Sequence, residues 1–479
     1  MKTNLRKTNI VGTIGPASES EEVFTNLVKA GLNVARINFS HGGYEENATK
    51  IDTIKKVRET LNKPVALMLD TKGPEIRTGK LESGDEKVLI TEGQTFTFLF
   101  DDVIGNETKA SISYKNLYQD VVPGAKILVD DGAIEFEVVE IVGKDVVCKA
   151  INAGRLGSRK TVNVPGLKLN LPALSPKDID DITKGVKAGF DFIAASFVRR
   201  ASDVQEIRAL LDANGGEDVH IIAKIESQEG IDNFEEILEL ADGIMVARGD
   251  MGVEIPMEQV PVVQKHFIKR CNEVGKPVIT ATQMLESMQS SPRPTRAEVS
   301  DVANAVYDRT SCIMLSGECA MGKYPVVCVE TMVKISKNIE STIHYWKRFN
   351  EKNHKKSECF AKNIAITTGE TAENIDADAI VAYTHSGNTA RTLAGIGVQC
   401  PILAVTDSHR TYEQLAAAWN VTPILVEGEE TVENTISKGI EILKESGILE
   451  AGDTIALAGG AKALYNEKES QIVSAVMKI

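Results

Sequence analysis

The chain has 479 residues, of which 42% are hydrophobic and 25% charged, as is ordinary for a folded globular protein. Its 54 Lys and Arg against 68 Asp and Glu give a net charge of −14, which argues against nucleic acid as a partner. The seven cysteines show no C-x-x-C spacing, no apolar run is long enough for a membrane span, and Met1–Ile10 is not a signal-like segment, so we expect a cytoplasmic protein with no membrane partner.

Eight short runs that are apolar throughout recur along the first two thirds of the chain. They are Thr8–Ile14, Asn33–Phe39, Val65–Leu69, Phe192–Phe197, His220–Ile225, Gly243–Ala247, Val278–Thr282 and Cys312–Leu315. Helical patterns follow most of them, at Glu21–Ala30, Tyr44–Leu61, Ala201–Ala213, Asn233–Leu240, Met257–Val274, Thr295–Asp308 and Tyr324–Glu340. Strands that are apolar on both faces belong to parallel sheets, and eight β-α units in series predict an α/β fold, a closed (β/α)8 or TIM barrel.

One connection, between the third and fourth runs, breaks this alternation. Residues 70–168 show no convincing helix but contain short alternating strands at Thr95–Phe98, Lys126–Val129 and Glu135–Val138. Turns are predicted at Pro123-Gly124 and Asp131-Gly132. We therefore expect a small β-barrel domain inserted after strand three, which would form a lid.

The last part of the chain forms another alternating pattern beyond a charged stretch, Lys347–Lys356, which we interpret as a linker. The expected elements are helices Ala361–Asn374, Tyr412–Trp419 and Val432–Glu445, and strands Ala379–Tyr383, Ile402–Thr406, Pro423–Val426, Thr454–Ala458 and Gln471–Met477. They predict an open α/β domain. The predicted borders are 1–69 and 169–342 for the barrel, 70–168 for the inserted domain and 343–479 for a C-terminal regulatory domain.

The active site of such a barrel lies at the C-terminal ends of its strands, so the polar residues there are the candidates. They are Arg36, Asn38, Ser40 and His41 at the second strand, Asp70, Thr71, Lys72, Glu75 and Arg77 after the third, Lys224 and Glu226 at the fifth, Arg248, Gly249 and Asp250 at the sixth, and Thr282 at the seventh.

Lys224 and Glu226 alternate along one strand, so both should face the barrel lumen. A structural ion pair at the strand tip is the alternative. Glu226 and Asp250 from neighbouring strands would form a two-carboxylate site suited to Mg²⁺.

Arg36 alternates with Asn38 and Ser40 and suits phosphate recognition. Asn38, Ser40, Asp70 and Thr71 together offer oxygens for a monovalent cation, although ordinary strand-end hydrogen bonding explains them equally well. The segment Gly317–Lys323 resembles a phosphate-binding P-loop, but Tyr324 replaces the required Ser or Thr, so we interpret it as barrel architecture. Together, the polar residues at the C-terminal ends of the strands predict a Mg²⁺-dependent enzyme that acts on a phosphorylated small molecule.

Several long motifs closely resemble the pyruvate kinase family over residues 5–345. They are TIGPAS (13–18), NVARINFSHG (33–42), DTKGPEIRTG (70–79), NVPG (163–166), KIE (224–226), MVARGDMG (245–252), ATQMLESM (281–288) and PTRAEVSDVANA (294–305). The resemblance implies a phosphotransferase that moves the phosphoryl group of phosphoenolpyruvate to ADP, giving pyruvate and ATP in the last step of glycolysis. It also implies Mg²⁺ and K⁺ as cofactors and a homotetramer.

The resemblance assigns roles residue by residue. Lys224, Thr282 and Arg36 would be catalytic; Arg36, Gly249, Asp250 and Thr282 would bind substrate; Asn38, Phe39, Ser40, His41, Arg77 and Lys160 would bind nucleotide; Glu226 and Asp250 would hold Mg²⁺; and Asn38, Ser40, Asp70 and Thr71 would hold K⁺. In the family an acidic residue at the position of Glu75 accompanies potassium dependence, and lysine there accompanies independence.

The C-terminal domain departs from the family pattern in the segment Ala458–Lys462, which lacks the longer Gly-rich loop of many members. Thr384, Ser386, Asn388 and Thr389 nevertheless follow a strand and open a helix, so they could bind a phosphorylated allosteric effector. An ordinary capped β-α turn is an equal alternative.

Rival functions for the whole protein are a phosphohistidine enzyme, a Schiff-base aldolase and an inactive metabolite-binding paralogue.

Overall fold

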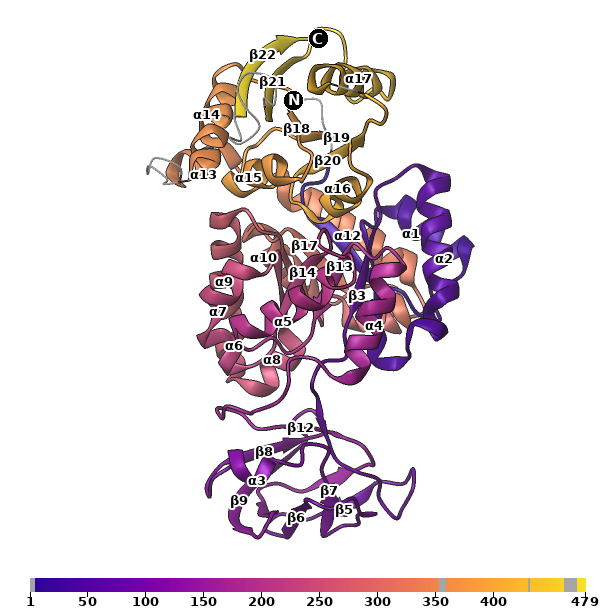
Figure 1. Cartoon of the computed structure of the whole chain (residues 1–479), viewed down its shortest axis with the longest axis vertical. Coiled ribbons are helices and arrows are strands. Elements are labelled where there is room, and N and C mark those ends of the chain that lie inside the picture. The colour runs from indigo at the N-terminus through magenta and orange to yellow at the C-terminus, as the bar shows by residue number, and fades with distance from the viewer. Residues whose placement is uncertain (1–4, 353–358, 430, 461–471) are drawn as a thin grey trace.

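The computed structural model of the chain describes residues 5–352, 359–429, 431–460 and 472–479. Figure 1 shows an elongated molecule with an inserted β domain at one end, a barrel in the middle and a C-terminal α/β domain at the other end. None of the helices in these ranges is long and apolar enough to cross a membrane.

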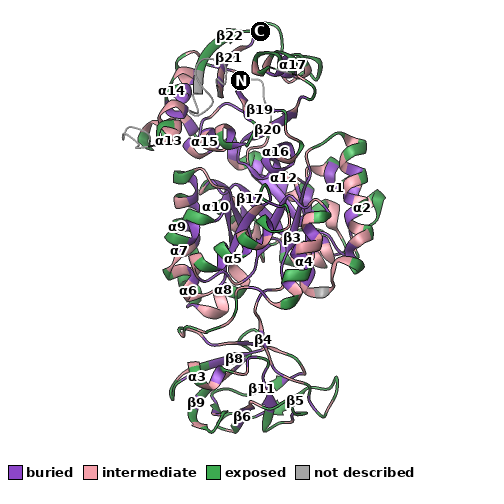
Figure 2. Cartoon of the chain, viewed as in Figure 1, coloured by how far each residue is buried: buried purple, intermediate pink, exposed green. Residues whose placement is uncertain are grey.

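The central domain is a closed barrel of eight parallel strands in the order β1-β17-β16-β15-β14-β13-β3-β2, which confirms the predicted fold class. The strands are β1 (Asn9–Thr13), β2 (Val34–Asn38), β3 (Ala66–Asp70), β13 (Phe192–Ala195), β14 (His220–Ile225), β15 (Gly243–Ala247), β16 (Val278–Ala281) and β17 (Cys312–Leu315). Met68, Phe192 and Met245 belong to the cluster that fills the lumen, and the strands are buried on both faces (Figure 2). This double burial explains why the strands read as continuous apolar runs.

Helices surround the barrel. They are α1 (Glu21–Ala30), α2 (Tyr44–Leu61), α4 (Pro176–Lys187), α5 (Ala201–Asp212), α6 (Gln228–Asp232), α7 (Phe234–Leu240), α8 (Arg248–Glu254), α9 (Val260–Val274), α10 (Arg296–Tyr307), α11 (Gly317–Ala320) and α12 (Pro325–Glu340), with 3-10 turns η1 (Phe39–His41), η2 (Met257–Gln259) and η3 (Glu286–Gln289). Helix α4 was not predicted, although Ser175 and Asp178 form a capping box at its start. Helix α8, which begins directly at the end of β15 and carries site residues, was not predicted either.

The inserted domain is a seven-stranded sheet in the order β4-β12-β8-β9-β10-β6-β7, with a two-stranded sheet β11-β5 beside it. Its strands are β4 (Ile76–Arg77), β5 (Val88–Ile90), β6 (Thr95–Leu99), β7 (Lys109–Ser111), β8 (Lys126–Val129), β9 (Ile134–Val142), β10 (Asp145–Ala150), β11 (Gly154–Leu156) and β12 (Thr161–Asn163). A bridge between Thr78 and Ile112 joins the two edges, so the sheet curls into a small barrel around Phe96, Phe98 and Phe136. The expectation that this region has no helix is wrong at one short turn, α3 (Leu117–Asp120).

The C-terminal domain has a five-stranded sheet in the order β20-β19-β18-β21-β22. Its elements are α13 (Tyr345–Lys352), α14 (Phe360–Asn374), β18 (Ala379–Tyr383), α15 (Asn388–Ile396), β19 (Ile402–Thr406), α16 (His409–Gln414), η4 (Leu415–Ala417), β20 (Val421–Leu425), α17 (Val432–Glu445), β21 (Thr454–Gly460) and β22 (Ile472–Lys478). The linker predicted over Lys347–Lys356 is wrong as far as residue 352, because α13 buries Tyr345 and Phe349 on one face; residues 353–356 lie outside the described part of the chain.

The C-terminal domain packs on the barrel end opposite to the C-terminal ends of the strands. The Nδ2 of Asn9, at the start of β1, donates to the carbonyl of Ala418 at 2.7 Å. The Nε2 of Gln414 donates to the carbonyls of Asp191 (3.1 Å) and Asp218 (2.8 Å), just before β13 and β14. The rim that carries the candidate residues therefore faces the inserted domain. The predicted domain borders stay predictions.

Candidate active site

The centre of the rim is Lys224, near the end of β14. Its Nζ donates to Ser196 Oγ at 2.7 Å and to Asp70 Oδ1 at 3.2 Å, and it lies 3.0 Å from Glu226 Oε1. Burial would lower the lysine pKa, but Asp70 and Glu226 raise it above its ordinary value. The charged form of the ammonium in the mouth of the barrel is therefore favoured.

Arg36 reaches the same carboxylate from β2. Its Nε donates to Asp70 Oδ2 at 2.6 Å and its Nη1 donates to Thr13 Oγ1 at 2.7 Å. Burial opposes ionisation of Asp70, but Arg36 and Lys224 more than offset it and hold the pKa of Asp70 below its usual range. Asp70 is thus an anion that positions two cations at the rim.

Glu226 follows β14 and is 1% exposed. Its Oε2 accepts a hydrogen bond from the Phe197 backbone at 2.6 Å, and its Oε1 is paired with the Lys224 ammonium at 3.0 Å. Burial raises the pKa of this carboxyl to about 8, with the neighbouring charge of Asp250 also raising it and Lys224 opposing. A buried carboxyl at the strand end, close to a second carboxylate, fits a bound cation.

Asp250 is exposed at the start of α8 and lies close enough to Glu226 for its negative charge to raise the pKa of that carboxyl. Among the described residues there is no group of three or more His, Cys, Asp and Glu side chains arranged for a metal ion. A divalent ion at Glu226 and Asp250 would therefore need water or substrate oxygens, which is the usual situation for Mg²⁺.

The four residues considered for a monovalent cation come from neighbouring segments. Asn38 and Asp70 are register partners on β2 and β3, and Thr71 follows directly. Asn38 Oδ1 accepts from the Ser40 backbone at 3.0 Å, and Thr71 Oγ1 accepts from the Ser196 backbone at 3.0 Å. The side-chain oxygens of Asn38 and Thr71 thus accept ordinary backbone hydrogen bonds at the strand ends. Together with the one carboxylate of Asp70, these neutral oxygens form a set of ligands that suits a monovalent ion.

Thr282 has an unusual backbone. It follows β16 with φ of 67°, and Gln283 follows with φ of 52°. A left-handed conformation is an outlier for a β-branched residue and costs on the order of 1–3 kcal/mol, so surrounding contacts must maintain it. The Thr282 hydroxyl accepts from the Gly249 backbone at 2.8 Å and donates to the Ala281 carbonyl at 2.6 Å.

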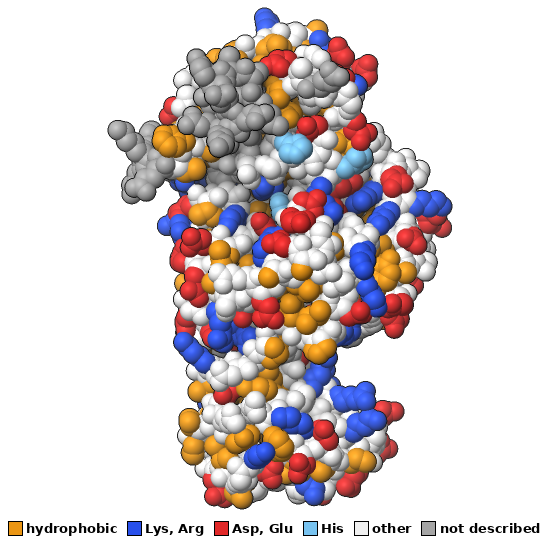
Figure 3. Space-filling model, viewed as in Figure 1, with side chains coloured by type: hydrophobic (Ala, Val, Ile, Leu, Met, Phe, Trp, Pro, Cys, Tyr) orange, Lys and Arg blue, Asp and Glu red, His pale blue; other side chains and the backbone are white. Residues whose placement is uncertain are grey.

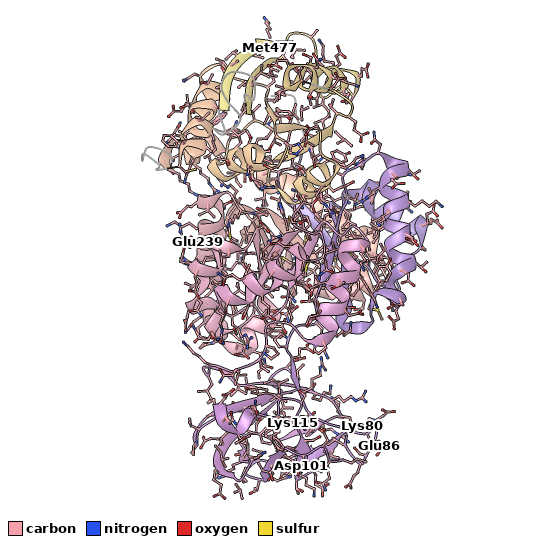
Figure 4. The ribbon with its side chains drawn as sticks, viewed as in Figure 1. Lys80, Glu86, Asp101, Lys115, Glu239 and Met477 are labelled. Atoms are coloured by element: carbon pink, nitrogen blue, oxygen red, sulfur yellow. The ribbon has the colours of Figure 1, made fainter. Side chains whose placement is uncertain are left out.

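An open cleft of about 990 Å³ separates the rim from the inserted domain. Glu75, Asn163, Asp250 and Glu254 are among its lining residues, and Asn163 Nδ2 donates to Glu254 Oε1 at 2.8 Å across it. Figure 3 shows the indentation between the two domains. Figure 4 places the labelled Lys80, Glu86, Asp101 and Lys115 on the inserted domain and Met477 at the opposite end of the molecule.

The residues assigned to nucleotide lie in two places. Arg77 and Lys160 belong to the inserted domain, where Arg77 pairs with Glu75 at 2.9 Å and Lys160 with Asp130 at 2.8 Å. Phe39 is fully buried with its ring against Phe190, so only its backbone is available to a ligand. Ser40 lies in η1 beside it. The side chain of His41 lies outside the described part of the structure.

The residues assigned to an effector surround the start of α15. Thr384 is buried, and the guanidinium of Arg391 donates to the Ser386 carbonyl at 2.9 Å and to Asn388 Oδ1 at 2.7 Å. The cap residue Gly387 has φ of 83° and provides no side-chain cap, and Thr389 lies in the first turn. Both the effector interpretation and the ordinary turn remain compatible with this arrangement.

The P-loop-like segment is part of the barrel architecture. Glu318 is fully buried and its carboxylate accepts from the Leu285 and Ser316 backbones at 3.0 and 2.7 Å. A turn that already holds a carboxylate has no room for phosphate.

Sequence reasoning missed Ser196 and Thr13 and assigned no role to Arg248. Ser196 bonds Lys224 and lies near the C-terminal end of the predicted fourth run, Phe192–Phe197, so the strand-end criterion would have found it. Arg248 donates to the carbonyls of Ala281 (3.0 Å) and Thr282 (2.5 Å), contacts that no sequence pattern reveals.

Comparison with known proteins identifies relatives over nearly the whole chain. The sequence model described as "Pyruvate kinase, barrel domain" matches residues 5–329, and "Pyruvate kinase, alpha/beta domain" matches residues 362–470. A pyruvate kinase of Clostridium acetobutylicum is 47% identical over 457 residues, which are 95% of this chain and 96% of that protein. Pyruvate kinases of Staphylococcus epidermidis and Staphylococcus saprophyticus are 50% and 49% identical, over 95% of this chain and 78% of each of theirs.

Proposed function

The chain belongs to the pyruvate kinase family, and from this membership we propose how its own residues divide the work of the reaction. The enzyme is a phosphotransferase (EC 2.7.1.40) that transfers the phosphoryl group of phosphoenolpyruvate to ADP, giving pyruvate and ATP. The observation that carries the assignment of roles is the charged Lys224 ammonium, held within 3.2 Å of Ser196, Asp70 and Glu226 at the barrel rim.

Lys224 and Arg36 act as the phosphoryl-binding cations. Phosphoryl transfer involves little covalent work for the protein, so positioned positive charge supplies most of the catalysis. Asp70 fixes both cations, through bonds of 3.2 Å to Lys224 and 2.6 Å to Arg36. This arrangement supports Lys224 as the group that stabilises charge on the transferring phosphoryl group and on the enolate oxygen.

Glu226 and Asp250 would hold Mg²⁺, and Asn38, Ser40, Asp70 and Thr71 would hold K⁺. The closeness of two carboxyl groups supports the first assignment, because the charge of Asp250 raises the pKa of Glu226. A bound Mg²⁺ would neutralise charge on the substrate's carboxylate and phosphate. The backbone N–H groups of Gly249 and Asp250 would receive the substrate carboxylate at the start of α8.

Thr282 would orient the proton that completes the product. Its hydroxyl donates to Ala281 and accepts from Gly249, which leaves one acceptor site on the oxygen. That site can hold a water beside the enolate carbon, where the proton must arrive. Thr282 is therefore proposed as a member of a proton relay.

ADP would bind between Asn38, Ser40 and the Phe39 backbone at the barrel and Arg77 and Lys160 on the inserted domain. Arg77 and Lys160 each have a carboxylate partner, Glu75 and Asp130, that fixes the position of the cation on the inserted domain. His41 is retained in this group from its motif.

Regulation and assembly are further proposals. Thr384, Ser386, Asn388 and Thr389 would bind a phosphorylated effector, supported by the backbone and guanidinium groups around the start of α15. We also propose a homotetramer in the cytoplasm, which light scattering and cell fractionation can measure.

A coupled assay of pyruvate formation from phosphoenolpyruvate and ADP, with Mg²⁺ and K⁺ varied separately, tests the proposal. We expect activity only when both substrates and Mg²⁺ are present, and a large increase with K⁺. Trapping of a phosphohistidine, or of a lysine adduct by borohydride, would instead favour the two rival enzyme classes. Full activity without a divalent cation would refute the assigned metal site.

A further inference from the structure

Arg248 is the first residue of α8 and connects four parts of the barrel. Its Nε donates to the Ala281 carbonyl at 3.0 Å and its Nη2 to the Thr282 carbonyl at 2.5 Å. Its Nη1 donates to Asp301 Oδ1 on α10 at 2.8 Å and to Gln264 Oε1 on α9 at 3.4 Å. The side chain is 12% exposed, so the guanidinium is largely shielded from water.

The two carbonyls bound by Arg248 belong to the two peptide planes that meet at the Thr282 Cα. Fixing both planes fixes the backbone dihedrals of Thr282, and this residue adopts the left-handed conformation at φ of 67°. Left-handed backbone is unfavourable for a β-branched residue unless its surroundings determine it. Arg248 is therefore placed to hold Thr282 in this conformation.

The direction of the Thr282 hydroxyl follows from the same backbone. The Gly249 N–H, on the residue next to Arg248, donates to that hydroxyl at 2.8 Å. Arg248 and Gly249 thus hold the backbone and the side chain of Thr282 from one short segment.

We propose that Arg248 is a positioning residue that holds the Thr282 hydroxyl in its reactive orientation, with Asp301 as the anchor of the guanidinium. This inference rests on the proton-relay role proposed for Thr282. Arg248 does not need to touch the substrate, because its effect is transmitted through the two carbonyls. The planar guanidinium binds both carbonyls and the carboxylate at once, which a lysine ammonium cannot reproduce in the same geometry.

The chain offers a matched control at the other end of the barrel. Arg208 on α5 donates to the Val219 carbonyl at 2.9 Å and to Asp242 Oδ2 at 2.7 Å, and also to the Glu217 carbonyl. It therefore makes the same kinds of contact as Arg248 but far from the rim. Arg208→Lys measures what the loss of such a network does to the fold alone.

The experiment compares Arg248→Lys and Asp301→Asn with Arg208→Lys in the steady-state assay. We expect kcat of Arg248→Lys to fall about 100-fold, the effect of displacing a reacting group by about 1 Å, with a much smaller change in KM for phosphoenolpyruvate. Asp301→Asn retains an acceptor oxygen and should lose less activity, and Arg208→Lys should retain wild-type kcat. Exchange of the pyruvate methyl protons with D₂O, followed by NMR, should fall in parallel with kcat.

A double-mutant cycle separates positioning from general damage. In a Thr282→Ala background the hydroxyl is absent, so Arg248→Lys should cost far less than it does in the wild type. Equal costs in both backgrounds, or equal kcat losses in Arg248→Lys and Arg208→Lys, would overturn the inference. If Thr282→Ala is fully active, the proposed role of Thr282 itself is wrong. If Arg248→Lys does not fold, the same cycle with Asp301→Asn decides, since additive costs there overturn the inference.

Discussion

Replacement of Lys224 by methionine should nearly abolish phosphoryl transfer and leave a folded protein. The methionine has a similar unbranched shape but provides no charge and no N–H donor. Ser196 and Asp70 lose contacts of 2.7 and 3.2 Å, yet Asp70 keeps Arg36 at 2.6 Å. Glu226 loses its neighbour at 3.0 Å, and because burial already raises its pKa to about 8, it can take up a proton at neutral pH. The remaining buried charges are therefore compensated.

The size of the loss follows from the distances at which Lys224 meets its acceptors, 2.7–3.2 Å. A unit charge at about 4 Å contributes about 4 kcal/mol at an effective dielectric constant of about 20. If the lysine interacts with charge that develops in the transition state, its removal should lower kcat about 1,000-fold, since about 1.4 kcal/mol corresponds to tenfold.

The assay is coupled pyruvate formation with saturating phosphoenolpyruvate, ADP, Mg²⁺ and K⁺, beside a melting curve. Lys7→Met is the matched control, because Lys7 also has a buried ammonium, bound to Asn420 Oδ1 at 2.9 Å at the opposite end of the barrel. We expect Lys7→Met to change stability without a comparable loss of kcat. A Lys224→Met enzyme within about tenfold of wild-type kcat would refute the electrostatic role.

Three further predictions address the cations, the domain interface and regulation. Glu75→Lys should make activity largely independent of K⁺ by delivering one positive charge near the proposed site, and equal wild-type rates in K⁺ and in tetramethylammonium at equal ionic strength would contradict it. Glu413 on α16 lies at the domain interface, 3.6 Å from Arg58 of α2. Burial raises the pKa of Glu413 from 4.5 to about 8, so the folded chain binds the carboxyl proton more tightly than the unfolded chain does. The resulting stability is complete below about pH 4.5 and is lost as pH rises through about 8. Glu413→Gln should therefore raise the apparent melting temperature at pH 9 and leave it nearly unchanged at pH 4; an equal shift at both pH values would show that Glu413 is not the group. Thr384→Ala with Ser386→Ala should leave maximal rate intact and weaken activation by phosphorylated metabolites, and a wild-type enzyme that no such metabolite activates would exclude the effector site.

The barrel could be predicted from the sequence for two reasons. Its strands are buried on both faces and therefore appear as continuous apolar runs, and the unit of one strand followed by one helix recurs along the chain. The alternation in Ala223-Lys224-Ile225-Glu226 likewise predicted that Lys224 and Glu226 face the same side, and their side chains meet at 3.0 Å. These features depend only on local periodicity, which a single sequence displays.

The backbone conformation of the loops after the strands, and the contacts between segments that are distant in sequence, could not be predicted. The directions of Thr282 and Phe39 are set by a left-handed backbone and by the turn η1, and neither leaves a periodic signal. The partners of Arg248 come from helices α9 and α10, distant in sequence. The charged residues of α13 concealed two buried aromatic positions, Tyr345 and Phe349, whose spacing of four was the available helical signal.

The antiparallel pairing of β4 with β12 has a consequence for how the barrel folds. β3 and β13 are neighbours in the closed barrel, yet residues 71–191 lie between them in the chain. Closing a long flexible connection costs entropy, about 0.6 kcal/mol for each doubling of its length. Because Arg77 pairs with Thr161 and Ile76 with Val162, the folded insertion brings its own two ends together. Once it has folded, the barrel closes across residues 71–75 and 164–191 instead of the whole segment 71–191. The order of folding that loses least entropy is therefore the insertion first and the β3–β13 seam afterwards.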